Sequence, residues 1–163
     1  ATIRGAASLI IGRTAPKLDI QQNREVADYM DIMRICLPDA AGNEVWQVSF
    51  PLKKALREQV HAGLVQLDAG QTANARETLA NFLLGMTDEA LFWYFEQPMA
   101  LLHLGPILSR MAKVGTETAR KASQAVINRV FRKLEDEQLK VVGDFLRQLL
   151  VECEPRRPEQ AIG

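Results

Sequence analysis

The sequence predicts a mainly α-helical single domain, a bundle of five to seven helices with a small β element near the N-terminus. From about residue 49 onward, apolar residues recur at three- and four-residue spacing, which is typical of amphipathic helices. Only residues 44–50 alternate apolar with polar side chains as a strand does. The chain has 163 residues, of which 47% are hydrophobic and 25% charged, and this suits one globular domain. We therefore expect a domain over residues 1–155 and a disordered polar tail at residues 156–163.

The most apolar part of the sequence, residues 82–111, is expected to organise the rest. It holds five of the ten aromatic residues, and Ala90–Phe95 is an unbroken apolar run. A helix that is apolar all round has no face for solvent, so the run is predicted to lie in the core or in an interface.

The N-terminal part contains the β element. Residues 1–22 show little periodicity, apart from a short strand candidate at Ser8–Ile11. Apolar residues at helical spacing predict a helix over Asn23–Cys36, with the asparagine as its cap. Residues 44–50, EVWQVSF, are the best strand candidate. Because one strand alone is not stable, we expect it to pair with Ser8–Ile11 or with another subunit.

The remainder is predicted to be helical, with glycine and proline marking the boundaries. A helix beginning near Ser49 and Pro51 ends before Gly70, and its apolar stripe is Leu52, Leu56, Val60, Leu64 and Leu67. The following helices are expected at residues 72–84, closed by Gly85; from Thr87; from Pro98, broken at Gly105–Pro106; from Gly115 to Leu134; and at residues 136–152.

Composition limits the classes of function and the compartment. The chain has 20 basic and 20 acidic residues, so no overall charge favours nucleic acid or an anionic membrane. No apolar stretch is long enough for a membrane span, and Leu9–Ile11 is too short for the core of a signal peptide. Cys36 and Cys153 lie far apart; we expect free thiols in the cytoplasm, with a single disulfide as the alternative.

The last predicted helix carries a narrow apolar stripe with a strict alternation of three- and four-residue steps. Such spacing forms the seam of a coiled-coil contact, here two heptads long. One interpretation is a dimer interface; the other is an ordinary helix packed on the chain's own core. The stripe consists of Leu139, Val142, Leu146, Leu149 and Cys153.

Basic residues gather between Arg110 and Lys133, where the sequence has seven Lys or Arg and one acid, Glu117. Such a segment can face phosphates, or it forms a solvated face that acids elsewhere balance. The candidate nucleic-acid contacts are Lys121, Gln124, Asn128, Arg129, Arg132 and Lys133.

A spacing pattern overlaps this basic segment in ASQAVINRVFRKLEDEQL, residues 122–139. A serine is followed by an aliphatic residue, an arginine, Leu-Glu and a further Leu, at Ser123, Ile127, Arg129, Leu134, Glu135 and Leu139. The pattern resembles the recognition-helix region of winged helix-turn-helix regulators. The resemblance implies a turn before the serine, a wing of strands after the last leucine, and DNA binding.

No motif for catalysis is present. The sequence has no Walker-type glycine loop, no dinucleotide fingerprint and no serine nucleophile elbow. His61 and His103 have no partner at metal-ligand spacing; we expect His61 on the surface and His103 hydrogen-bonded in the core. We therefore predict a protein that is not an enzyme and needs no cofactor or metal.

These observations favour a non-catalytic protein-interaction or regulatory module, a homo-oligomer that also binds another protein through apolar helix faces. The first alternative is a DNA-binding transcriptional regulator that uses the basic helix at residues 116–133. The second is a helical bundle with a small-molecule pocket, lined by Phe92, Trp93, Tyr94, Phe95 and Met99.

Overall fold

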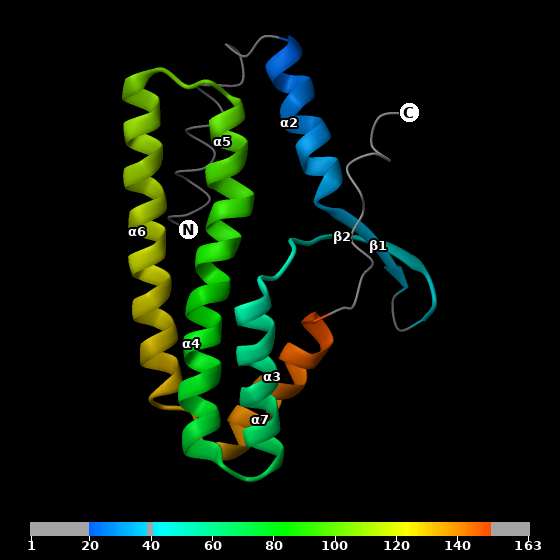
Figure 1. Ribbon diagram of the computed structural model, residues 1–163, viewed down its shortest axis with the longest axis vertical. Helices are drawn as coiled ribbons and strands as arrows, with labels where there is room; N and C mark the ends of the chain where they lie inside the picture. Colours follow the sequence, from blue (N-terminus) through cyan, green and yellow to red (C-terminus); the bar gives the residue numbers. More distant parts are fainter. Residues whose placement is uncertain (1–19, 39–40, 151–163) are drawn as a thin grey trace. The chain divides into compact units, whose positions relative to one another are not determined.

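The computed structural model describes residues 20–38 and 41–150. The fold is mainly helical with one small antiparallel sheet, as predicted (Figure 1). Its described residues form two compact units: unit 1 contains residues 20–50 and 91–119, and unit 2 contains residues 51–90 and 120–150. None of the helices described is long and apolar enough to cross a membrane. The single domain over residues 1–155 stays a prediction, and the tail at 156–163 lies outside the described residues.

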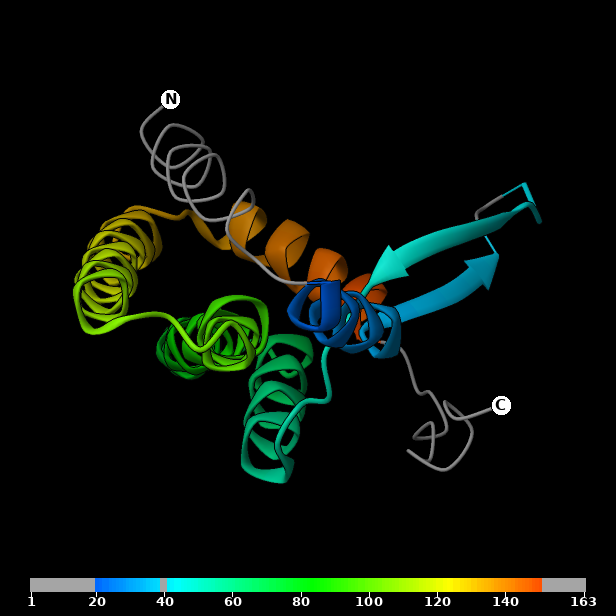
Figure 2. The ribbon, with the colours of Figure 1, turned by 90° about the horizontal axis from the view of Figure 1, so that it is seen from above.

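Unit 1 begins with helix α2 (Ile20–Ile32), followed by strands β1 (Arg34–Pro38) and β2 (Glu44–Val48). The two strands pair antiparallel (Figure 2). Cys36 lies opposite Trp46 at the centre of the register. The strand predicted at 44–50 is thus confirmed at Glu44–Val48, and its neighbour is β1, which was not predicted. Pairing of β2 with another subunit stays a prediction. Ser8–Ile11 lies outside the described residues, and β1 supplies the pairing.

The helix predicted to reach Cys36 ends at Ile32 because the next residues form β1. Helical spacing continues through this segment, yet Ile35 is β-branched and favours a strand. The pairing also satisfies the backbone: Ser49 N–H donates to the carbonyl of buried Met33 at 2.7 Å. Long-range pairing therefore overrides the local helical pattern.

The second part of unit 1 contains a π-helix, η2 (Phe92–Glu96), the short helix α5 (Gln97–Leu101) and the first half of α6 (Pro106–Phe131). The predicted break at Gly105–Pro106 is confirmed, with the proline as the first residue of α6. His103 lies in the turn before it, exposed and with φ of 44°. The expectation of a core histidine is therefore wrong, whereas His61 is exposed as predicted.

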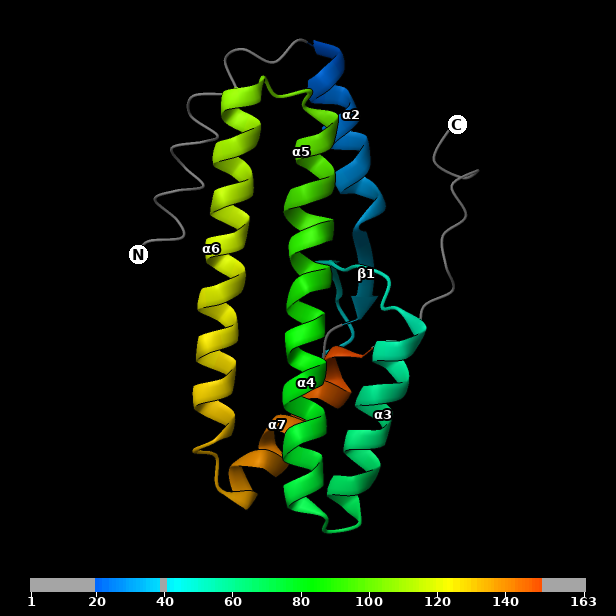
Figure 3. The ribbon, with the colours of Figure 1, turned by 60° about the vertical axis from the view of Figure 1, so that its left-hand side comes forward.

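Unit 2 contains α3 (Lys54–Asp68), most of α4 (Thr72–Leu91), the second half of α6, and α7 (Asp136–Leu149). Helix α3 lies beside α4, and α7 crosses the two obliquely (Figure 3). Gly70, with φ of 74°, ends the turn after α3 as predicted. The core of unit 2 is built from buried apolar residues of all four helices: Val60, Leu67, Ala75, Leu79, Phe82, Phe131, Leu139 and Leu146.

Glycines set how closely α3 packs on its neighbours. A Cβ on Gly63 of α3 would lie 2.6 Å from Cδ2 of Leu79 in α4, and one on Gly85 of α4 would lie 2.5 Å from Cδ2 of Leu56 in α3. Gly85 therefore does not end a helix, as the sequence suggested, but lies inside α4 where a leucine needs its space. The Thr87–Glu89 segment, predicted as a new helix start, is also internal to α4, and Thr87 Oγ1 donates to Leu83 O.

A similar correction applies to Gly115, at which a new helix was expected to begin. It lies inside the continuous helix α6, and nothing approaches its Cβ position within 4 Å. An isolated glycine weakens a helix by only about 1 kcal/mol, so it does not break one of 26 residues.

The central apolar stretch is only partly buried. Phe82 is fully buried in unit 2, but Phe95 is 44% and Phe92 36% exposed. Of the two predicted locations, the core is therefore excluded for these two rings, and an interface stays a prediction. Consecutive residues on a helix point in different directions, so one core cannot accommodate all of them.

Replacement by alanine is predicted to have opposite effects at Gly63, which lies close to a leucine, and at Gly115, which has open surroundings. Gly63→Ala should destabilise unit 2, because overpacking costs about 1–3 kcal/mol and outweighs the gain in helix propensity. Gly115→Ala should raise stability by about 0.5–1 kcal/mol, since its surroundings are open. Urea denaturation followed by circular dichroism measures both; equal stabilisation by the two variants would contradict the close approach at Gly63.

Candidate functional site

The predicted seam of α7 divides between the core and the surface. Leu139 and Leu146 are buried, and both belong to the core of unit 2. Val142 packs partly against that core, whereas Leu149 is exposed, and Cys153 lies outside the described residues. Leu139 and Leu146 therefore follow the second interpretation of this helix, because their side chains pack on the chain's own core.

A second apolar row on α7 shares only Leu149 with the predicted seam. Val141, Phe145 and Leu149 recur every fourth residue and are 69%, 57% and 51% exposed. We call these three residues the outer face of α7. Residues four apart lie on the same side of a helix, so they form one apolar strip. The predicted seam contains neither Phe145 nor Val141, because two adjacent valines do not reveal which of them points inward.

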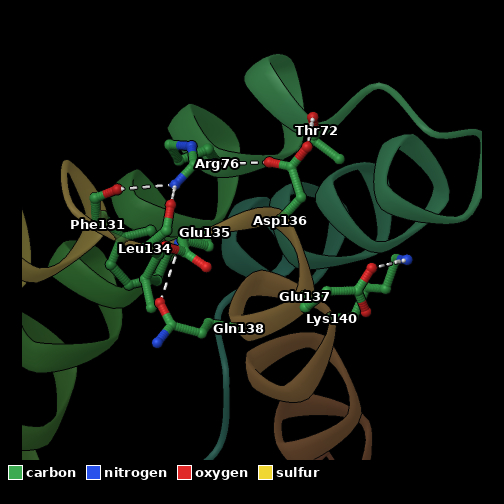
Figure 4. A network of polar contacts seen from close by, with 9 residues as sticks. All are labelled: Thr72, Arg76, Phe131, Leu134, Glu135, Asp136, Glu137, Gln138 and Lys140. Carbon is green, nitrogen blue, oxygen red and sulfur yellow. Dashed lines mark hydrogen bonds and ion pairs between the residues drawn. The ribbon is translucent and has the colours of Figure 1, made fainter.

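A polar network holds the start of α7 in place (Figure 4). Arg76 of α4 donates from Nη1 to the carbonyl of Phe131 at 3.2 Å and to that of Leu134. These carbonyls belong to the last turn of α6 and the connection after it, where the backbone has too few helical donors of its own. The guanidinium thus supplies the missing donors.

The same arginine binds α7 directly. Its Nη2 lies 2.8 Å from Oδ1 of Asp136, and Thr72 Oγ1 donates to the other oxygen of that carboxylate at 3.1 Å. Gln138 accepts the backbone N–H of Glu135 at 3.0 Å, as in a capping box. The network joins α4 to the connection between α6 and α7, and it thereby fixes which side of α7 faces the core.

The candidate nucleic-acid contacts lie on α6 and in the turn that follows it. Lys121, Arg129, Arg132 and Lys133 are exposed, as is Asn128, while Gln124 is half-buried. Arg132 Nε donates to Asn128 O. Among the residues described, the structure gives no ion pair to Lys121, Arg129 or Lys133.

The helix-turn-helix geometry that the resemblance implied is not found in this segment. Helix α6 runs without interruption from Pro106 to Phe131, so there is no turn before Ser123. The residues after Leu134 form α7, and residues 136–149 are helix where a wing of strands was implied. The basic helix remains a charged surface without the motif.

The five residues of the predicted apolar pocket do not share one buried surface. Phe92 and Phe95 are exposed, whereas Trp93, Tyr94 and Met99 are half-buried. Tyr94 packs edge-on against Phe50, with ring centroids 5.5 Å apart.

The π-helix is held by a tyrosine of α2. The Tyr29 hydroxyl donates to the carbonyl of Trp93 at 2.7 Å. Burial raises the pKa of Tyr29, and the nearby Tyr94 raises that pKa further. The hydroxyl therefore keeps its proton, and its hydrogen bond, through the neutral pH range. The indole Nε1 of Trp93 is buried, and no acceptor lies within reach among the described residues.

A buried acid in α4 was not recognised from the sequence. Glu89 is buried, and its Oε1 pairs with Lys53 Nζ at 2.5 Å. The preceding Asp88 pairs with Arg120 Nε at 2.8 Å. Lys53 thus supplies the opposite charge that a buried carboxylate requires, while Oε2 of Glu89 is buried and has no hydrogen-bond partner among the described residues. In the described part of the chain, no three metal-binding side chains lie together.

Strand β2 is unusual because all five of its residues are exposed. Trp46 and Val48 are each 55% exposed, and the guanidinium of Arg34 lies over the Trp46 ring at 4.6 Å from its centroid. The sequence identified the strand but not its exposure, because alternation normally indicates one buried side.

The chain gives no match to any protein-family model, curated protein or solved structure.

The network predicts that Arg76 cannot be replaced by another cation. Lysine lacks the planar fork that donates to two carbonyls and a carboxylate, so Arg76→Lys should lower the free energy of unfolding by about 1–3 kcal/mol. Arg57→Lys is the matched control, since Arg57 is exposed on α3 and should tolerate the change within about 0.5 kcal/mol. Thermal denaturation of both variants measures the difference; equal stability would show that the network contributes nothing.

Proposed function

We propose that this protein is a non-catalytic helical module of protein interaction or regulation, which assembles with itself and binds another protein. The observation that carries the proposal is the distribution of apolar side chains. Among the described residues, sixteen large apolar side chains are exposed and eleven apolar residues are buried. Single exposed apolar residues are ordinary, but contiguous groups of them mark surfaces that bind a partner.

The exposed apolar residues gather in contiguous groups within each unit. In unit 2 they form the outer face of α7. In unit 1 they form a strip on the first half of α6, where Ile107 is 74% exposed and Met111 and Val114 follow at helical spacing. On β2, Trp46 and Val48 are exposed on one face of the hairpin, and Val45 is exposed on the other. A helix or strand with apolar residues on its outer side supports binding to another polypeptide.

A second candidate function is nucleic-acid binding, which the exposed cations of α6 and of the turn after it favour. Lys121, Arg129 and Lys133 make no ion pair in the described residues, so their charge is available to phosphates. Against this candidate, cations near the C-terminal end of a helix are also stabilised by the helix dipole itself. The interaction module therefore remains our first proposal.

The mass in solution tests the proposal. Size-exclusion chromatography with light scattering should give a mass above the 18.2 kDa of one chain at micromolar concentration. The ratio of absorbance at 260 and 280 nm in the same run should indicate no bound nucleic acid at moderate salt.

Two outcomes would change the ranking. A species of 18.2 kDa at every concentration would contradict self-assembly. Nucleic acid that copurifies, is released by salt and is lost in Arg129→Glu/Lys133→Glu would favour the second candidate, because reversing those charges removes phosphate contacts without touching the core.

A further inference from the structure

The outer edge of β2 is open within residues 20–38 and 41–150, where β1 is its sole neighbour. The backbone of an antiparallel pair alternates between residues that bond to the partner strand and residues that point away from it. Because Ser49 N–H donates to Met33 O, the Met33–Ser49 pair is hydrogen-bonded. Counting along the register, the backbone groups of Val45 and Gln47 face β1, and those of Glu44, Trp46 and Val48 face the open edge.

The two edges of the hairpin differ in their ability to accept a third strand. By the same alternation, the outward residues of β1 are Arg34, Cys36 and Pro38. Proline has no N–H, and an edge that carries it is protected against pairing. The outward residues of β2 all have an N–H, and the strand contains no proline, glycine or lysine. The open edge of β2 is therefore the one that can bind another strand.

We propose that this edge pairs antiparallel with β2 of a second copy of the chain, around a two-fold axis at Trp46. This inference rests on the proposed self-assembly and names its surface. In that register Trp46 faces Trp46 of the second copy, and Glu44 faces its Val48. All three outward residues then exchange backbone hydrogen bonds, about six in total. A symmetric dimer of this kind joins two hairpins into one four-stranded sheet. Such a sheet is more stable than an isolated two-stranded one, which is only marginally stable.

Charge complementarity favours a second copy as the occupant. Arg34 lies opposite Val48 in the hairpin, so the proposed register places Arg34, Val48 and Glu44 of the second copy in one row. Side chains in a row lie on the same face of a sheet. The backbones of Arg34 and that Glu44 are two strand spacings apart, about 10 Å, which the two long side chains can span. The two-fold axis creates this pair twice.

The Arg34 guanidinium already extends from β1 across β2, over the Trp46 ring. Its ion pair with Asp31, at 3.0 Å, joins two exposed side chains. Such a pair contributes little, so it does not prevent Arg34 from reaching the second copy.

The first test separates the backbone of Trp46 from its side chain. By the alternation of the hairpin, the Trp46 N–H faces the open edge, so Trp46→Pro removes a donor that only the dimer uses, together with the indole, whereas Trp46→Thr removes the indole alone. Trp46→Pro should weaken dimerisation about tenfold or more, as measured by sedimentation equilibrium under reducing conditions. Trp46→Thr keeps the amide and should weaken dimerisation only about threefold. Val65→Asp, on the exposed side of α3, is the control and should leave the dimer constant unchanged, whereas loss of the dimer in Phe145→Asp would place the contact on the outer face of α7 instead.

The second test does not depend on how well the hairpin tolerates proline. Arg34→Glu and Glu44→Arg should each weaken self-association about three- to tenfold, because like charges then meet across the axis. An equimolar mixture of the two variants should restore it, since both rows of the mixed dimer pair opposite charges. Damage to the hairpin would not be repaired by mixing.

The outcomes distinguish the inference from the proposed function. Dimers that survive Trp46→Pro, or that are lost in Phe145→Asp, would overturn the β2 pairing and keep self-assembly. Equal loss in Trp46→Pro and Trp46→Thr, or no recovery on mixing, would overturn the register. A wild-type monomer at all concentrations would overturn self-assembly itself.

Discussion

The close approach of α3 to its neighbours is the constraint on which unit 2 depends. Gly63 and Gly85 leave space for leucines of the facing helix, and Gly143 of α7 leaves space in the same way for Leu67 of α3. Since interiors are packed as densely as organic crystals, a helix moved outward by one methyl group would leave a gap along its whole length. The burial of Leu79, Phe82, Leu139 and Leu146 therefore requires these three residues without side chains.

The same constraint determines what stays outside. A helix packed through glycine sits close to its neighbour and buries a narrow strip, so apolar residues at the margin of that strip remain exposed. On α7 the buried strip contains Leu139, Gly143 and Leu146, and the outer face contains Val141, Phe145 and Leu149. The Arg76 network adds a polar constraint at the start of the helix, because a rotation of α7 would break the contact with Asp136. The exposed apolar face is a consequence of how unit 2 packs.

In unit 1 the constraint is the hydrogen-bonded pairing of two strands. The single bond from Ser49 to Met33 sets the alternation, and the alternation decides which amides of β2 are available for a further strand. Backbone geometry, rather than side-chain chemistry, thus makes the edge of β2 the one that can pair with a further strand.

Much of the fold could be predicted from the sequence. The apolar stripe of α3, the start of α6 at Pro106 and strand β2 follow from periodicity and from the restricted backbone of proline. Gly85 and Gly115 could not be interpreted locally, because a glycine that ends a helix and one that admits a neighbouring leucine look alike in a sequence. Strand β1 was missed since its pattern fits a helix as well, and only pairing with β2 decides between them.

The candidate surfaces were harder to predict than the fold. The seam of α7 was recognised, but periodicity does not show whether Leu139 and Leu146 meet the chain's own core or a second copy. The exposure of Phe95 and Trp46 likewise depends on tertiary neighbours, which a local pattern does not contain. The charged side chains of Lys121, Arg129 and Lys133 were correctly predicted to be exposed, because charged side chains are rarely buried.

Amide hydrogen exchange at neighbouring residues of β2 tests the central claim most directly. The account predicts that the Gln47 amide is protected at every protein concentration, because it bonds to β1. The Trp46 amide should exchange freely in dilute solution and become protected as the concentration rises through the dimer constant. A Trp46 amide that exchanges freely at all concentrations, while the protein is a dimer by mass, would contradict the pairing of β2 with a second copy.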